Sequence, residues 1–273
     1  MPDHSYGAII RSHARTRLLE QLIVSLRTQT NPPRKIIIVD SSPKRTDFLD
    51  LLALDVEIVS YPQEPFNFSK AINIGISAIT SSNVLIISSH MSLKDRSLIE
   101  RGMMTAAQNG IDAITWLAPV TIEQAESETI IDRRSFCGNN GLSNSMSMVR
   151  KDLYDMRLYR EEVFSAEDQE WSWWYLKEMN GKILRVNSPH LAYLNPYHSG
   201  EVFNELKIFN ETLSLGHFVW RRFIYPDRIL ARLMRGCLAF VRGRIARAKM
   251  HWRFAWLMTK ANFVRPTVQS KYF

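Results

Sequence analysis

Two adjacent carboxylates, Glu167 and Asp168, are the side chains of this sequence best suited to acid–base chemistry. Aromatic residues surround them in the sequence: Phe164, Trp171, Trp173, Trp174 and Tyr175. A single carboxylate is enough to act as a general base that takes the proton from an attacking hydroxyl group. The alternative is structural, because Ser165 followed three residues later by Asp168 also resembles a capping box at the start of a helix. Both roles are compatible with one helix N-terminus.

Polar segments follow three apolar runs elsewhere in the chain: Arg11–Arg15, Asp40–Ser42 and Ser88–His90. Any strand ends in polar residues, so one such segment alone indicates little. The three segments together indicate a binding site only if the three strands end at the same edge of a sheet.

The elements that must position these residues alternate along the first third of the chain. Four apolar runs are predicted strands: Tyr6–Ile10, Lys35–Val39, Val56–Tyr61 and Val84–Ser88. Apolar residues at helical spacing from Leu18 to Leu26, and the segment Phe68–Ala78, are predicted helices. This order predicts an α/β fold with a doubly wound sheet, which binds ligands at the carboxyl ends of its strands.

Three segments resemble family 2 inverting glycosyltransferases of the GT-A fold. The segment 9–42 is similar to the opening of that family, Phe66–Ile76 resembles its Asn-x-Gly helix, and Ser165–Trp171 resembles its late Glu-Asp…Trp element. Their order and spacing agree over about three-quarters of the chain. The resemblance implies a mixed GT-A sheet, a nucleotide-sugar donor and inversion at the transferred sugar.

The resemblance also implies roles for particular residues. It makes Asp168 the catalytic base, with Glu167 orienting or contacting the acceptor. It places the donor against strand ends and the second predicted helix, with Asp40 accepting a hydrogen bond from the base and Lys70 neutralising diphosphate charge. The remaining residues implied at the donor are Ser12, His13, Arg15, Ser69 and Asn73. For Lys70, an ordinary solvated helix residue is an equal alternative.

The chain departs from the family at Ser88-Ser89-His90, where relatives usually have Asp-x-Asp holding a divalent metal ion. Three interpretations of His90 stay open: it binds Mn²⁺ or Mg²⁺ together with the donor diphosphate, it contacts phosphate directly, or it is structural. Ser88 and Ser89 are predicted donor contacts with it. His190 and His198 are weaker candidates for the same region.

On the acceptor side, the turn-rich stretch Phe136–Ser147 resembles the family's acceptor loop. Asn144 and Trp171 are the predicted acceptor-binding residues, because the resemblance places Asn144 near the sugar and an indole face can stack on a sugar ring.

The C-terminal part has a different composition from the rest. Between His217 and Arg265 there are twelve Lys and Arg residues against one acid, interleaved with tryptophan and phenylalanine, in a chain whose net charge is +8. We predict a GT-A domain over residues 1–216 and a basic helical extension over residues 217–273. Such helices bind anionic membrane surfaces. Packing on the catalytic domain and nucleic-acid binding are the alternatives, and no nucleic acid is expected as a partner.

The 273 residues, 45% hydrophobic and 23% charged, suit a globular protein, and two distant cysteines indicate neither a disulfide framework nor a zinc site. With no apolar run long enough for a signal or a membrane span, we expect a cytoplasmic enzyme, peripheral at the inner face of the membrane. The predicted function is transfer of a sugar to a lipid-linked glycan acceptor in bacterial surface polysaccharide synthesis, such as O-antigen or capsule. The alternative is a non-catalytic scaffold that binds a nucleotide sugar or a glycan.

Overall fold

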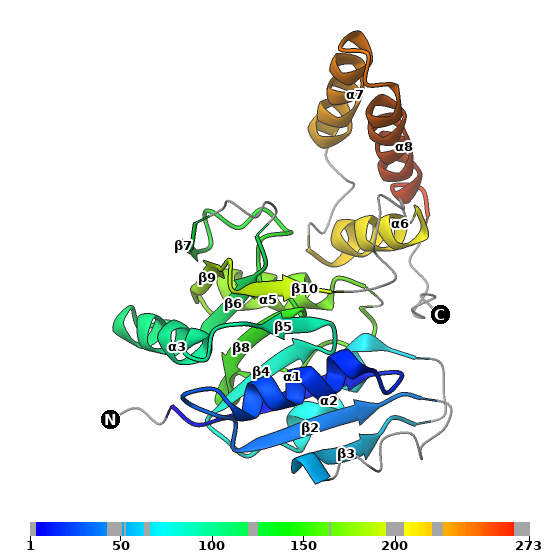
Figure 1. Cartoon of the computed structure of the whole chain (residues 1–273). Helices are drawn as coiled ribbons and strands as arrows, with labels where there is room; N and C mark the ends of the chain where they lie inside the picture. Colours follow the sequence, from blue (N-terminus) through cyan, green and yellow to red (C-terminus); the bar gives the residue numbers. More distant parts are fainter. Residues whose placement is uncertain are drawn as a thin grey trace.

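An eight-stranded mixed sheet forms the centre of the computed structural model, in the order β3-β2-β1-β4-β8-β6-β9-β7 (Figure 1). The structure describes residues 4–42, 51, 53–62, 66–119, 125–163, 165–194, 205–219 and 226–264. The strands of this sheet are β1 (Tyr6–Ser12), β2 (Lys35–Asp40), β3 (Glu57–Ser60), β4 (Asn83–Ser88), β6 (Ala113–Leu117), β7 (Ser127–Ile131), β8 (Met146–Arg150) and β9 (Ile183–Asn187). Two short strands, β5 (Met91–Leu93) and β10 (Leu191–Tyr193), pair separately.

The first four strands of the sheet run parallel. β1 lies between β2 and β4, and β3 extends the sheet beyond β2. Ser12 is in register with Asp40, and Arg11 with Ser88, so the three predicted polar strand ends lie at one edge. The α/β fold and the four predicted strands are confirmed. β8, which pairs antiparallel with both β4 and β6, makes the sheet mixed.

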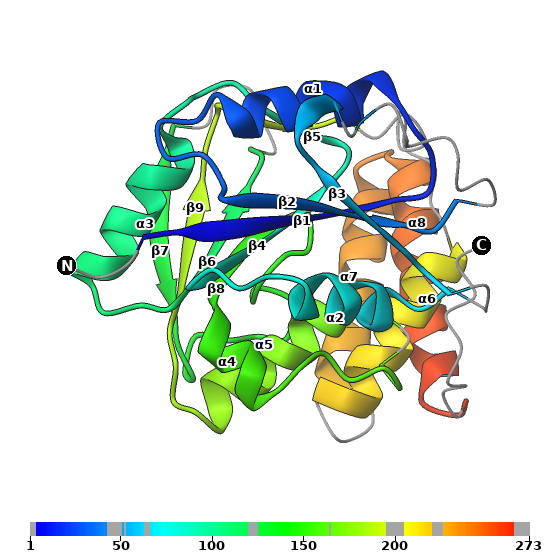
Figure 2. The same cartoon turned by 90° about the horizontal axis from the view of Figure 1, so that it is seen from below.

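Helices cover both faces of the sheet (Figure 2). One face carries α1 (Arg17–Arg27) and α3 (Leu98–Gln108), and the other carries α2 (Phe68–Ser77), α4 (Lys151–Met156) and α5 (Glu167–Lys177). Successive strand residues point to opposite faces, so Ile10 packs in the core beneath α1 while Ile9 packs in the core with α2 and α5. The continuous apolar runs of the sequence reflect this burial on both faces.

The start of α5 differs from the expected capping box. Its N-cap is Ala166, whose left-handed backbone (φ 56°) costs about 1–2 kcal/mol for a residue with a Cβ. The capping-box interpretation of Ser165 is therefore wrong. A backbone held in such a conformation persists only where its surroundings fix it, and it turns the chain sharply into Glu167 and Asp168.

The C-terminal part is helical, as expected. α6 (Glu205–Ser214) continues into the π-helical turn η3 (Leu215–Val219), and α7 (Pro226–Val241) and α8 (Ile245–Ala261) form a hairpin that stands away from the sheet in Figure 1. α6 packs on α8, with Leu213 and Ala261 buried between them. The predicted boundary at residue 216 falls inside η3. Within the part of the chain that the structure describes, no helix combines the length and the apolar character needed to cross a bilayer.

Candidate functional site

The N-terminus of α5 presents Glu167 and Asp168 to a loop that precedes β8. Asp168 accepts two backbone hydrogen bonds, from the N–H of Asn144 at 3.1 Å and from the N–H of Gln169 at 2.8 Å. The Asn144 side-chain amide donates to Glu167 at 2.9 Å. The predicted acceptor residue Asn144 and the two predicted catalytic carboxylates thus form one connected group.

The environment of Asp168 changes its acidity. Burial, followed by the adjacent charge of Glu167, raises the pKa of Asp168 to about 7, against the opposing effect of the two N–H donors. Part of the side chain still reaches solvent. A carboxylate whose pKa lies near neutral pH is a suitable general base, since about half of it is ionised at pH 7 and the ionised form accepts a proton readily.

Residues outside the predicted set hold this group in place. The Tyr159 hydroxyl donates to the side-chain amide oxygen of Asn144, Oδ1, at 3.3 Å and lies 3.2 Å from the Tyr154 hydroxyl. The Gln169 side chain binds both the N–H of Gly141 and the carbonyl of Leu142, which ties the loop to α5. Sequence reasoning missed Tyr159, which lies outside the three motif segments, and Gln169, which lies within Ser165–Trp171 but was given no role there. The position of Gln169 directly after the carboxylate pair was the one available signal.

Two predicted donor residues on α2 have structural partners. The Asn73 amide binds the backbone of Tyr159 with both of its polar atoms, at 2.8 and 3.0 Å. Ser69, fully buried, donates to the carbonyl of Val163. These contacts fix the segment that carries Tyr159, and the predicted roles of Ser69 and Asn73 toward a donor stay predictions. Lys70 follows Asn67 in the first turn of α2, where the Asn67 side chain caps its N–H at 3.0 Å.

Trp171 is also a core residue and not an acceptor contact. It is fully buried, its indole N–H donates to the carbonyl of Arg157 at 2.9 Å, and its ring stacks on Tyr175. A ring with no exposed face cannot stack on a sugar, so the predicted acceptor role of Trp171 is wrong. Its burial instead anchors the helix that presents Asp168.

The loops after β1 and β2 lie together at the carboxyl edge. The N–H of Ser41 donates to the carbonyl of Ser12 at 3.0 Å, and His13 Nδ1 lies 3.1 Å from the carbonyl of Ser41. Asp40 is 2% exposed, and one of its oxygens accepts from the N–H of Ser42. Its buried Oδ2 has no hydrogen-bond partner among the described residues.

The other two predicted residues of the β1 loop make local contacts. Arg15 forms an ion pair with Glu20 at 2.7 Å, and the Ser12 hydroxyl donates to the carbonyl of Ala14. Both contacts lie within the loop or the first turn of α1. The roles of Ser12, His13 and Arg15 toward a donor stay predictions.

The end of β4 forms a tight turn. The Ser88 hydroxyl accepts from the N–H of His90 at 3.3 Å, Ser89 is buried, and the His90 ring meets the Tyr193 ring edge-on at 6.0 Å. The N–H of Leu194 donates to the carbonyl of His90 at 2.8 Å, which joins this turn to the chain after β10. His190 bonds through its backbone to Lys94, and His198 lies outside the described residues.

The side chains at this turn do not provide the ligands that a divalent metal ion requires from the protein. Hard divalent cations prefer several oxygen ligands, above all carboxylates, whereas this turn offers one imidazole and two hydroxyls. No group of three or more His, Cys, Asp or Glu side chains that could hold a metal ion occurs within the described ranges. Any metal here would be held mainly by the donor itself.

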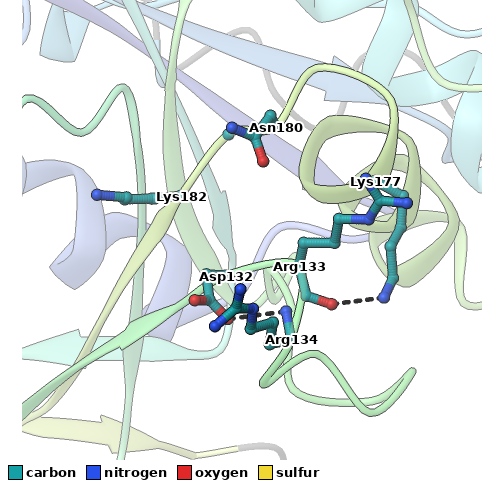
Figure 3. A pocket seen from close by; sticks show the side chains of 7 residues that line it. Asp132, Arg133, Arg134, Lys177, Asn180 and Lys182 are labelled. Atoms are coloured by element: carbon teal, nitrogen blue, oxygen red, sulfur yellow. Dashed lines mark hydrogen bonds between the residues drawn. The ribbon is translucent and has the colours of Figure 1, made fainter.

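A separate hollow of about 520 Å³ lies at the opposite end of α5. Its lining includes Arg133, Arg134, Lys177 and Lys182, with Asp132 accepting hydrogen bonds within its own turn (Figure 3). The eleven residues of α5 place it about 15 Å from Asp168. None of the predicted site residues lines it.

Comparisons with known proteins support the fold. No family model and no curated sequence matches this chain. Among solved structures, the mannosyltransferase PcManGT from Pyrobaculum calidifontis, in complex with GDP-Man and Mn²⁺, is similar with a TM-score of 0.59 at 11% identity, over 96% of this chain and 76% of that chain. S. aureus TarS 1-349 in complex with UDP is similar with a TM-score of 0.55 at 14% identity, over 95% and 90% of the two chains.

A third similar structure is the glucosyl-3-phosphoglycerate synthase from Mycobacterium tuberculosis with Mn²⁺, UDP and phosphoglyceric acid. Its TM-score is 0.53 at 12% identity, and the match covers 78% of each chain. This chain spans 55% of the longer TarS structure. The protein has the GT-A α/β fold of these glycosyltransferases. At such identities the likeness establishes the fold, and the chemistry must be argued from the site.

Proposed function

We propose that the protein is a glycosyltransferase that moves a sugar from a nucleotide-sugar donor to a hydroxyl group of an acceptor, with inversion at the anomeric carbon. The observation that carries this proposal is Asp168, a carboxylate with a pKa near 7 held at the start of α5. The neighbouring Glu167 lies near Arg11 at the edge where β1, β2 and β4 end, and the similar PcManGT structure, in complex with GDP-Man, is a precedent for nucleotide-sugar binding by this fold.

The chemical step follows from this arrangement. Asp168 takes the proton from the acceptor hydroxyl as that oxygen forms a bond to the anomeric carbon. The bond from the anomeric carbon to the diphosphate oxygen breaks, and its electron pair leaves with the nucleoside diphosphate. The N–H of Asn144 holds Asp168 and its side-chain amide holds Glu167, and both residues border the acceptor. The network of N–H donors keeps the carboxylate oriented before the substrate arrives.

On the donor side, Asp40 is the residue with the clearest capacity to accept a further hydrogen bond. Its buried Oδ2, which lacks a hydrogen-bond partner among the described residues, suits an N–H donor of a nucleotide base. We place the base beside Asp40, Ser12, His13 and Arg15, and the diphosphate near Ser88, Ser89, His90 and Lys70. His90 contacts phosphate in this proposal, because the turn lacks the carboxylates of a metal site.

The C-terminal hairpin suggests where the enzyme acts. Exposed apolar residues four, seven or eleven positions apart share a face on each helix: Leu230, Met234 and Val241 on α7, with Ile245 and Trp256 on α8. Exposed basic residues flank them: Arg235, Arg242, Lys249, Arg253 and Lys260. A hairpin that packed fully on the catalytic domain would bury this face. An apolar face flanked by cations instead suits an anionic membrane surface.

Membrane binding and the chemistry support each other. A lipid-linked glycan presents its sugar hydroxyls at the surface of the bilayer, so an enzyme docked there through α7 and α8 meets its acceptor. We therefore propose a peripheral enzyme at the cytoplasmic face of the membrane that acts in bacterial surface polysaccharide synthesis.

A non-catalytic scaffold is the second candidate, and the absence of carboxylates at Ser88-Ser89-His90 favours it. Donor turnover separates the two functions. Purified protein would be screened against nucleotide sugars by thermal shift, since a ligand at 100 times its dissociation constant stabilises the folded state by about 2.7 kcal/mol. Each donor that binds is then tested for hydrolysis and transfer. Binding without any turnover, in both wild-type protein and the Asp168→Asn variant, would establish the scaffold.

A further inference from the structure

Arg11, the penultimate residue of β1, lies between the strand ends and the carboxylates of α5. It is in register with Ser88 on the neighbouring strand β4. Two positions before them, Ile9 and Ile86 both pack in the core that includes residues of α2 and α5. Strand residues two apart share a face, so Arg11 and Ser88 lie side by side facing α5.

The guanidinium group of Arg11 is held in place, but not all of its N–H groups have hydrogen-bond acceptors. It lies over the ring of Phe68 at 4.8 Å, which fixes its plane. Its Nη1 is 4.0 Å from Glu167 Oε1, beyond hydrogen-bonding distance, and that oxygen already accepts from Asn144. This Nη1 is buried and, among the described residues, makes no hydrogen bond.

A buried guanidinium nitrogen without an acceptor is costly unless a ligand supplies one. An anionic oxygen of a ligand, placed between the β4 turn and Glu167, would accept a hydrogen bond from this Nη1. Arginine presents planar pairs of N–H donors that match phosphate oxygens. The same strand end lacks the carboxylates that would bring a metal ion to neutralise a diphosphate.

We propose that Arg11 binds the diphosphate of the nucleotide-sugar donor and supplies positive charge at a strand end that lacks metal-binding carboxylates; this inference rests on the proposed transferase function. As the sugar leaves, the bond between the anomeric carbon and the diphosphate oxygen breaks, and its electron pair stays on that oxygen. Arg11 donates N–H bonds to the phosphate that gains this charge, while Asp168 takes the acceptor proton. Arg11 is thus a donor-binding residue that also stabilises the leaving group.

The test compares ligands that differ only in the diphosphate. UDP with uridine, and GDP with guanosine, are titrated calorimetrically in EDTA, so that only groups of the protein meet the phosphates. The variants are Arg11→Met, which keeps length without charge, and Arg11→Lys, which keeps charge without the planar fork. Arg34→Gln is the matched control, because Arg34 is exposed and stands just before β2 at the opposite edge of the sheet.

For the nucleotide that wild-type protein binds, we expect Arg11→Met to weaken diphosphate binding about tenfold to a hundredfold, the range for a lost charge-assisted contact. Arg11→Lys should lose less, and nucleoside affinity should change less than about twofold in every variant. Equal loss for nucleoside and diphosphate would mean general damage to the pocket and would overturn the inference. So would unchanged diphosphate binding, or a wild-type protein that binds the nucleoside as tightly as the diphosphate. Wild-type protein that binds neither nucleotide, with or without Mn²⁺, would instead contradict the proposed function itself.

Discussion

The start of α5 and the α7–α8 hairpin use their side chains in opposite ways. At the start of α5, polar groups are buried and satisfied by one another: Asp168, Glu167 and Asn144 share hydrogen bonds of 2.9 to 3.1 Å. On the hairpin, apolar side chains such as Met234 and Trp256 are more than half exposed. Buried charge and exposed apolar surface both lower stability. Each is expected where a protein binds something, which is why we propose a different partner for each of the two regions.

The largest expected effect is at the buried carboxylate. Asp168→Asn keeps the shape but cannot take a proton, so transfer should fall about 10²- to 10⁴-fold while donor affinity stays within about twofold. Steady-state rates and calorimetric titration check the two parts. Asp155→Asn, an exposed carboxylate on α4 that pairs with Lys151, is the control and should leave both unchanged. Transfer within tenfold of the wild-type rate would remove Asp168 from the role of base.

The pH profile sharpens the same point. The base must be ionised, so kcat/KM should fall about tenfold per pH unit below the pKa of Asp168, which is about 7. Because the charge of Glu167 helps to raise that pKa, Glu167→Gln should lower it and move the acidic limb of the profile to lower pH. A limb that stays in place or moves upward would show that another group is being titrated.

On the hairpin, adding charge to the exposed apolar face should prevent membrane binding. Met234→Glu with Trp256→Glu should weaken binding to anionic liposomes by at least about tenfold, since burying one large apolar side chain contributes about 1.5–3 kcal/mol. Met156→Glu, equally exposed on α4, is the control.

Truncation near residue 216 is a coarser test, because it cuts through η3 and removes the α8 partner of α6. Unchanged liposome binding in sedimentation would contradict the membrane proposal, as would RNA binding with a steep salt dependence.

The sequence predicts a part of the structure well where burial or a motif leaves a recognisable pattern, and poorly where a role depends on contacts between distant residues. Apolar runs and turn residues specified β1, β2 and β4 and their polar ends, because burial on both faces leaves a strong pattern. Asp168 and Asn144 could be named because a motif carries them. The sequence could not separate ligand contacts from supports: Asn73 and Trp171 lie in the same motifs, yet they bind Tyr159 and Arg157 across the fold. Arg11 was overlooked, since its importance depends on its position beside Glu167.

A smaller effect should distinguish supporting residues from ligand contacts. Asn73→Ala removes two buried hydrogen bonds to Tyr159 and should lower the free energy of unfolding by about 1–3 kcal/mol. Urea unfolding measures the loss. Donor affinity at a temperature where the variant is folded should change less than about threefold. A large loss of affinity without a loss of stability would instead assign Asn73 to the donor site.

The smallest effect is expected at the turn after β4, and it tests how the diphosphate is neutralised. Because this turn offers one imidazole and two hydroxyls, we expect EDTA to change the transfer rate by less than about threefold and His90→Ala to weaken donor binding about threefold to tenfold. If His90 held a metal ion, EDTA would abolish transfer, and donor affinity measured in Mn²⁺ would fall on acidification as protonation of the imidazole competes with the metal. His90→Asp separates the two cases further. With a metal, the new carboxylate supplies the oxygen ligand that hard cations prefer and should preserve turnover; without one, it places a negative charge against the diphosphate and should weaken donor binding more than His90→Ala does. The comparison of these two variants in EDTA and in Mn²⁺ therefore decides between an ion and the side chains of the protein as the source of positive charge.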